Sequence, residues 1–136
     1  MTDAQLVALA STAMAKAYAP YSGYRVGAAL LTAEGRVFTG CNIENAAYSP
    51  TCCAERTAVF KAVSEGFCDF LAIAVVGGRN GMITAPCPPC GVCRQVLAEF
   101  CRPDSFRVVL GHADGQESHT LESLLPRGFF PGQIRP

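Results

Sequence analysis

Two cysteine segments constrain the fold of this chain more than any other feature. The first is Cys53-Ala54-Glu55-Arg56, and the second is Pro86-Cys87-Pro88-Pro89-Cys90-Gly91-Val92-Cys93-Arg94-Gln95. Each segment lies where a loop is expected to lead into a helix. Together they supply soft metal ligands, one carboxylate and two arginines. We interpret them as one metal site, so the fold must bring two distant loops together.

Hydrophobic periodicity predicts alternating helices and strands. Asp3 is expected to cap a helix that runs to about Tyr18, and this helix buries an alanine-rich stripe that suits close packing against a sheet. Two strands that span 24–31 and 36–41 form a hairpin around a turn at 32–35. Further along, the pattern predicts a helix at 53–65, a buried strand at 71–76 that ends at Gly77-Gly78, a helix at 91–100 and a strand at 106–110.

This order of elements predicts an α/β fold with three layers. Strands that alternate with helices run parallel, whereas the opening hairpin is antiparallel, so we expect a mixed sheet of about five strands with helices on both faces. The whole chain, residues 1–136, is expected to form one domain. Ligands bind beyond the carboxyl ends of the strands in such sheets. Both cysteine segments are therefore expected at the same edge.

Composition excludes several classes of function. Eleven basic and eleven acidic side chains cancel, which argues against a nucleic-acid partner and favours a small, nearly neutral ligand. No apolar run reaches the length of a membrane span, and the start of the chain lacks the pattern of a signal peptide. Eight cysteines in a domain that can bury about two-thirds of its surface need not form disulfides. We expect a cytoplasmic protein.

The cysteine spacing indicates a catalytic zinc site. Zinc in such sites takes three protein ligands and leaves its fourth position to water. Cys90 and Cys93 have C-x2-C spacing, and Cys53 would be the third ligand. Glu55 lies in the same first helical turn as Cys53, within reach of that water. The pattern alone leaves Cys87 open as an alternative ligand, because Cys87 and Cys90 repeat the same spacing.

Three thiolates around a dication leave a negative centre that needs compensation. The amino ends of two helices would direct their positive dipole ends at the cysteines. Arg56 and Arg94 lie beside them in sequence, and either could donate hydrogen bonds to a thiolate. The residues therefore predict a charge-balanced site but leave open which arginine balances it.

The motifs resemble those of the zinc-dependent cytidine deaminases, in the small-subunit type that uses three cysteines. The similarity includes Cys-Ala-Glu-Arg and Pro-Cys-Gly-x-Cys-Arg-Gln, and it extends over Tyr18-Ala19-Pro20-Tyr21-Ser22, Val26-Gly27-Ala28-Ala29-Leu30, Gly40-Cys41-Asn42-Ile43-Glu44-Asn45 and Leu124-Leu125-Pro126. The resemblance favours Cys53, Cys90 and Cys93 as ligands over Cys87 and Cys52. It implies hydrolytic deamination of cytidine and 2′-deoxycytidine, with Glu55 as the acid and base that protonates N3 and the departing amine.

The resemblance also implies a nucleoside pocket shared between subunits. Asn42 and Glu44 leave a strand on the same side and would hold a sugar hydroxyl. Tyr24 replaces the phenylalanine usual in the family and would pack against the base, and Ala54 would also contact the substrate. Tyr48 and Phe129 would reach neighbouring sites in a homotetramer with one Zn²⁺ per subunit.

Two other functions remain open at this point. Aminonucleoside antibiotic deaminases, such as blasticidin deaminase, share the cysteine and glutamate motifs. A structural zinc module without activity would be favoured if Cys87 closed a four-thiolate site. A thiol-redox protein that uses Cys87 and Cys90 has little support, because a thioredoxin-like context is missing. His112 and His119 match no ligand motif.

Overall fold

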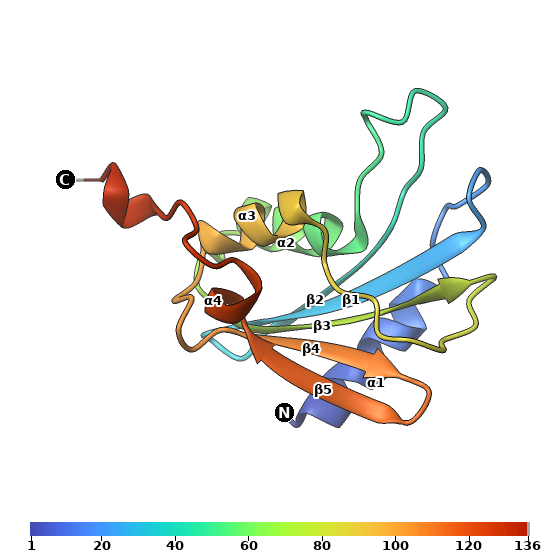
Figure 1. The fold of residues 1–136 in the computed structure, drawn as a ribbon, viewed down its shortest axis with the longest axis horizontal. Coiled ribbons are helices and arrows are strands. Elements are labelled where there is room, and N and C mark those ends of the chain that lie inside the picture. The colour runs from blue at the N-terminus through green and yellow to red at the C-terminus, as the bar shows by residue number, and fades with distance from the viewer. Residues whose placement is uncertain (136) are drawn as a thin grey trace.

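The computed structural model describes residues 1–135, which form a five-stranded sheet with helices on both faces (Figure 1). The strand order across the sheet is β2-β1-β3-β4-β5. Along the chain the elements are α1 (Asp3–Met14), β1 (Tyr24–Thr32), β2 (Val37–Cys41), α2 (Ala54–Ser64), β3 (Phe70–Arg79), α3 (Gly91–Ala98), β4 (Arg107–His112), β5 (Gly115–Thr120), α4 (Leu121–Leu124) and a 3₁₀ turn (Pro131–Gln133).

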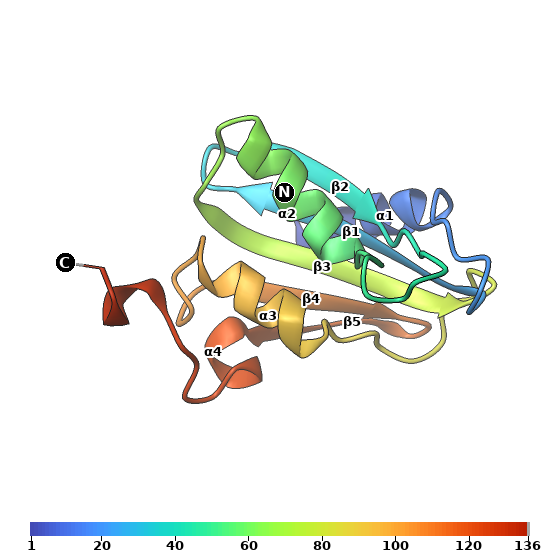
Figure 2. The same ribbon diagram turned by 90° about the horizontal axis from the view of Figure 1, so that it is seen from above.

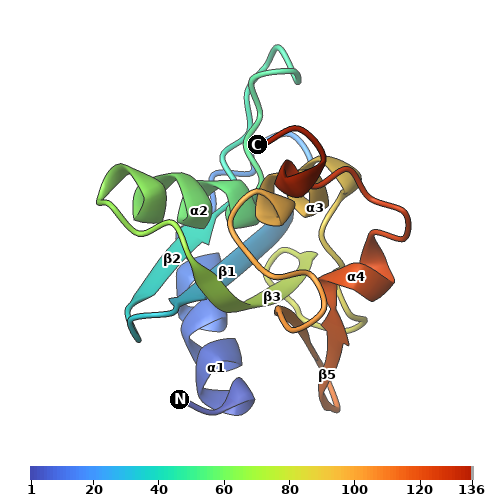
Figure 3. The ribbon, with the colours of Figure 1, turned by 90° about the vertical axis from the view of Figure 1, so that its left-hand side faces the viewer.

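The sheet is mixed, as the sequence predicts. β1 pairs antiparallel with β2 and β3, β3 pairs parallel with β4, and β5 returns antiparallel to β4. Because β2, β3 and β4 run in the same direction, the loops that follow β2 and β3 leave the same edge. α2 and α3 come after those loops and lie side by side over one face (Figure 2), while α1 covers the other (Figure 3). The predicted three-layer α/β architecture is confirmed.

The first helix differs from its prediction at both ends. Thr2, rather than Asp3, is the N-cap: its hydroxyl accepts a hydrogen bond from Gln5 N at 3.1 Å, and its own N–H donates to the Gln5 side chain at 2.8 Å. This capping box satisfies two amide groups that a helix leaves unpaired. The helix ends at Met14 and not at Tyr18, because the N–H of Tyr18 donates instead to a loop carbonyl, that of Asn42, at 2.9 Å.

Glycines allow both helix layers to lie close to the sheet. A Cβ on Gly27 of β1 would lie 2.0 Å from the Ala10 carbonyl oxygen of α1, and one on Gly40 of β2 would lie 2.5 Å from the Ala54 carbonyl oxygen of α2. No side chain fits at either contact. The close approach at Gly40 sets the position of the first turn of α2, which carries the first cysteine segment.

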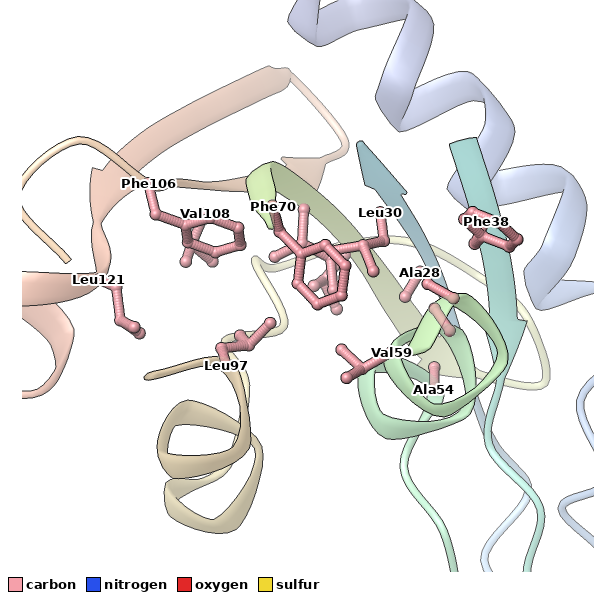
Figure 4. Packing of buried hydrophobic residues seen from close by; sticks show 14 of the residues in the cluster. Ala28, Leu30, Phe38, Ala54, Val59, Phe70, Leu97, Phe106, Val108 and Leu121 are labelled. Carbon is pink, nitrogen blue, oxygen red and sulfur yellow. The ribbon is translucent and has the colours of Figure 1, made fainter. Parts of the chain in front are cut away.

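The core under α2 and α3 is apolar and continuous. Figure 4 shows Val59 of α2 and Leu97 of α3 facing Leu30 and Phe70 of the sheet. Leu121 is fully buried at the far side of this cluster, so the short α4 is anchored to the same core. The two helices that directly follow Cys53 and Cys90 therefore pack on the same core.

One strand boundary was predicted wrongly and one strand was not predicted. β3 does not end at Gly77-Gly78 but continues to Arg79, because both glycines pair with β1. A Cβ on Gly78 would lie 1.8 Å from the Met82 carbonyl oxygen, so glycine serves a tight loop contact here and does not end the strand. β5 has no counterpart among the predicted strands, since its sequence Gly-Gln-Glu-Ser-His-Thr has no apolar alternation.

Among the described residues, no helix has the length and apolar character needed to cross a bilayer.

Candidate zinc and substrate site

Three cysteine sulfurs meet where α2 and α3 begin. The sulfur of Cys90 lies 3.8 Å from that of Cys53 and 3.6 Å from that of Cys93, and all three lie within 4.8 Å of one another. Tetrahedral zinc with Zn–S bonds of about 2.3 Å separates its sulfurs by about 3.8 Å. The three sulfurs therefore suit a zinc ion, with a fourth position left for another ligand.

The local backbone explains why these sulfurs converge. Cys53 and Cys90 are the N-cap residues of α2 and α3, both in extended conformation, and Cys93 lies one turn into α3. The amino ends of both helices thus point at the sulfurs, where their partial positive charge stabilises thiolates. Gly91 is the first residue of α3, and a Cβ there would meet nothing within 4 Å.

The two other candidate cysteines lie outside this group. Cys87 lines the wall of the adjacent hollow, and its side chain approaches Gly77 of β3. Cys52 pairs its backbone with Ile43, and its sulfur accepts a hydrogen bond from the Thr57 hydroxyl at 3.7 Å. Within residues 1–135, the geometry therefore favours the ligand register that the sequence resemblance implied.

The two arginines make different contacts. Nη2 of Arg56 donates to the sulfur of Cys53 at 3.3 Å. Arg94, which was expected as an alternative donor to a thiolate, donates instead from Nε to the Pro89 carbonyl at 2.8 Å and from Nη1 to the Leu124 carbonyl at 2.6 Å. The expectation for Arg94 therefore does not match the contacts, because its Nε and Nη1 atoms both donate to backbone carbonyls.

The sulfurs and the nearby carboxylate influence one another's protonation. A hydrogen bond from Cys93 is the largest cause that lowers the pKa of Cys53, and the Arg56 guanidinium acts in the same direction. Burial raises the pKa of Glu55 to about 7, and the negative charge of Cys53 adds to this shift. A bound cation would act on Glu55 in the opposite sense, because it favours the carboxylate.

A hollow of about 180 Å³ opens beside the sulfurs. The predicted residues that line it are Asn42, Cys53, Ala54, Glu55 and Cys90. Glu55 is only 4% exposed, so the carboxylate belongs to the wall of the hollow and not to the outer surface. The fold thus brings a buried acid, two of the three candidate metal ligands and two predicted substrate contacts into the same space.

Three residues that the sequence did not mark also line this hollow, namely Val26, Thr51 and Pro88, as do the two other candidate cysteines, Cys52 and Cys87. Val26 lies two residues after Tyr24 in β1, so strand alternation could have placed it on the same face. Thr51 lies in the β2–α2 loop, and neither periodicity nor motif marks it in the sequence.

Asn42 is buried and ties the end of β2 to β1. Its Oδ1 accepts from Val26 N at 2.8 Å, and its Nδ2 donates to the Tyr24 carbonyl at 2.8 Å. An amide oxygen accepts two hydrogen bonds and an amide nitrogen donates two. Asn42 therefore supports the backbone of β1 and retains one donor and one acceptor for a ligand.

Glu44 lines a second hollow, of about 360 Å³, together with Tyr21, Ser22, Tyr48 and Thr51. Its carboxylate accepts hydrogen bonds from Tyr21 N at 2.9 Å, from Ser22 N at 3.1 Å and from the Ser22 hydroxyl. The hydroxyl bond is the largest cause that lowers the pKa of Glu44. Because Thr51 lines both hollows, they form neighbouring parts of one concave region.

The three aromatic candidates lie at different places. Tyr24 is 36% exposed and is not among the residues that line either hollow, although its ring lies against Gly77 beside Cys87. Tyr48 is 77% exposed at the rim of the second hollow. It lies in the long loop that extends away from the sheet between β2 and α2 in Figure 1. Phe129 is exposed, and its carbonyl accepts from the Gln95 side chain at 2.8 Å.

Comparisons with known proteins agree with this geometry. A family model described as the cytidine and deoxycytidylate deaminase zinc-binding region matches residues 1–110. A cytidine deaminase of Sporosarcina psychrophila is 52% identical over 126 residues, which cover 92% of this chain and 89% of that protein. A cytidine deaminase of Halalkalibacterium halodurans is 50% identical over 130 residues, 95% of each chain.

The fold of this chain is also similar to that of solved structures. The crystal structure of a cytidine deaminase from Burkholderia pseudomallei superposes with a TM-score of 0.86 at 46% sequence identity. The superposition covers 95% of this chain and 100% of that one.

Proposed function

The chain belongs to the cytidine and deoxycytidylate deaminase zinc-binding family, and we propose that it hydrolyses cytidine and 2′-deoxycytidine to uridine and 2′-deoxyuridine, releasing ammonia. One observation carries this proposal. Three sulfurs at zinc spacing lie beside a buried glutamate, and two of them, those of Cys53 and Cys90, line the same hollow as Glu55. A site with three protein ligands leaves a position for water, as hydrolysis requires.

Glu55 is proposed as the residue that moves protons. Zinc held by Cys53, Cys90 and Cys93 supplies a Lewis acid that makes water nucleophilic near neutral pH. The Glu55 carboxylate accepts a proton from the attacking water and delivers it to N3 of the cytosine ring. It then transfers the second water proton to the departing amine, so that the products are the uracil nucleoside and ammonia. Its burial beside the sulfurs supports this role.

Arg56 is proposed to balance the charge of the ligands. Its hydrogen bond to Cys53 places a permanent positive charge next to one thiolate, which withdraws electron density from that ligand. The amino ends of α2 and α3 act in the same direction.

The nucleoside is proposed to lie along the two hollows, with its base near Glu55 and its sugar toward Glu44. Asn42 has one free donor and one free acceptor in the first hollow, and Glu44 is fixed in the second by hydrogen bonds from Tyr21 and Ser22. These two side chains would hold the 3′-hydroxyl. Ala54 lines the wall beside the base, and the ring of Tyr24 would pack at its edge.

We also propose that residues 1–136 act as one catalytic domain in a cytoplasmic homotetramer. Tyr48 and Phe129 are large exposed aromatic side chains, which is typical of interface residues. Each would complete the pocket of a neighbouring subunit. Light scattering coupled to size-exclusion chromatography measures the assembly, and a stable monomer with full activity would contradict this part of the proposal.

The decisive experiment follows the ultraviolet absorbance of cytidine, 2′-deoxycytidine and blasticidin S with the purified protein, with zinc quantified per chain. The proposal expects stoichiometric zinc and turnover of the first two nucleosides. Turnover of blasticidin S alone would indicate an antibiotic deaminase. Stoichiometric zinc without turnover of any of the three would indicate a structural zinc module.

A further inference from the structure

Arg94 joins two backbone carbonyls that belong to different parts of the fold. Its Nε atom donates to Pro89 at 2.8 Å, and its Nη1 atom donates to Leu124 at 2.6 Å. Pro89 immediately precedes the ligand Cys90, whereas Leu124 is the last residue of α4. A planar guanidinium can serve two acceptors at once in a fixed geometry.

The loop that carries Cys90 has few other means of support. Residues 84–90 lie outside any helix or strand, and Pro88 and Pro89 have no N–H to donate. In the described part of the chain, the bond from Arg94 is the one hydrogen bond to the backbone of residues 86–89. Without it, the backbone that leads into Cys90 would be held by packing alone.

The other end of the contact is firmly anchored. Leu121 of α4 is fully buried in the core, and its N–H donates to the Phe106 carbonyl, next to β4, at 3.1 Å. The carbonyl of Leu124 lies at the end of this short helix, where the last turn leaves carbonyls without helical partners. Arg94 therefore connects a loop with little backbone support to an element that is fixed to the sheet.

We propose that Arg94 is a positioning residue for the zinc site, which braces the Pro89–Cys90 backbone against α4 so that Cys90 and Cys93 stay in register with Cys53. This inference rests on the proposed zinc function. It assigns the two arginines different tasks: Arg56 contacts a sulfur directly, whereas Arg94 acts through the backbone.

Arg94→Lys separates bracing from charge. Lysine keeps the positive charge but lacks the fork that reaches both carbonyls. Zinc release from the loaded protein is measured with the coloured chelator 4-(2-pyridylazo)resorcinol, alongside circular dichroism and the Tm. We expect Arg94→Lys and Arg94→Ala to release zinc about 10-fold faster than the unmodified protein. Arg94→Gln replaces either variant if that variant does not fold.

A matched control distinguishes local bracing from a general loss of stability. Val109→Ala creates a small cavity on the α1 side of the sheet, in a separate core cluster. It should lower the Tm without faster zinc release. Equal acceleration in this control would overturn the proposal, because zinc release would then follow overall stability.

The remaining outcomes are also decisive. Zinc release from Arg94→Lys at the unmodified rate would overturn bracing, either in favour of a charge effect if Arg94→Ala is fast, or of no role if it is not. If the unmodified protein itself held no zinc, the proposed function would fail, and the inference with it. A zinc-loaded, active protein with an unaffected Arg94→Lys variant would contradict the inference alone.

Discussion

Nη2 of Arg56 lies 3.3 Å from the sulfur of Cys53, within hydrogen-bonding distance for a sulfur acceptor. The donor carries a permanent charge, because guanidinium does not lose its proton in proteins. The contact couples a residue of the first turn of α2 to the N-cap of the same helix. The short segment Cys53–Arg56 thus supplies a proposed ligand, a proposed proton carrier and a counter-charge.

Arg56→Gln should lower kcat about 10- to 100-fold, because the charge that withdraws electron density from the thiolate is lost. Zinc should remain stoichiometric in this variant. Steady-state rates on cytidine and metal analysis of the same samples measure both quantities. Arg102→Gln is a suitable control, since the Arg102 side chain is 82% exposed and pairs only loosely with Asp104, at 3.8 Å. An unchanged kcat in Arg56→Gln would contradict the assigned role.

Glu55→Gln should keep the fold and the zinc but lose most activity. Glutamine has nearly the same shape and cannot carry a proton between water, N3 and the amine, and general acid–base catalysis contributes about 10²- to 10⁴-fold. We therefore expect kcat to fall at least about 100-fold. Glu65→Gln, at the exposed far end of α2, should leave kcat unchanged. Full turnover by Glu55→Gln would remove Glu55 from the mechanism.

The cysteine register leads to a separate prediction. Cys87→Ala should retain stoichiometric zinc, because its sulfur lies outside the three-sulfur group. Cys93→Ala should lose zinc, since only Cys53 and Cys90 would remain. Metal analysis after dialysis, with circular dichroism to verify folding, compares the two variants. Loss of zinc from Cys87→Ala together with its retention in Cys93→Ala would show that Cys87 and Cys90 form the ligand pair.

The layers of the fold and the convergence of the two cysteine segments are predictable from the sequence. Both depend on strong local signals: buried strands alternate with helices, and the carboxyl ends of β2 and β3 share an edge. Because each cysteine segment follows one of these strands, residue order and spacing are enough to place Cys53 near Cys90.

Features that depend on distant contacts are not predictable in this way. β5 is polar because it lies at the edge of the sheet. Its own sequence therefore does not indicate a strand, and only its pairing with β4 identifies it as one. One of the two contacts of Arg94 is with the carbonyl of Leu124 in α4, which lies thirty residues further along the chain. A strand that crosses Gly77 and Gly78 likewise reads as a turn until its partner strand is known.

Glu44→Gln tests the proposed sugar contact. An ionised carboxylate offers about four lone-pair positions, and hydrogen bonds from Tyr21 and Ser22 occupy three of those on Glu44. The remaining position would accept the 3′-hydroxyl. We therefore expect kcat/KM for 2′-deoxycytidine to fall about 10- to 100-fold.

In the same variant, kcat/KM for 2′,3′-dideoxycytidine should fall only slightly. This substrate lacks the 3′-hydroxyl, so neither the variant nor the unmodified protein can form the bond with it. The ratio of the two effects isolates the contact between Glu44 and the sugar. Glu34→Gln, in the exposed turn of the β1–β2 hairpin, controls for loss of a surface charge. If kcat/KM fell equally for both nucleosides, Glu44 would serve only to hold the backbone of Tyr21 and Ser22, and the sugar would have to be bound elsewhere.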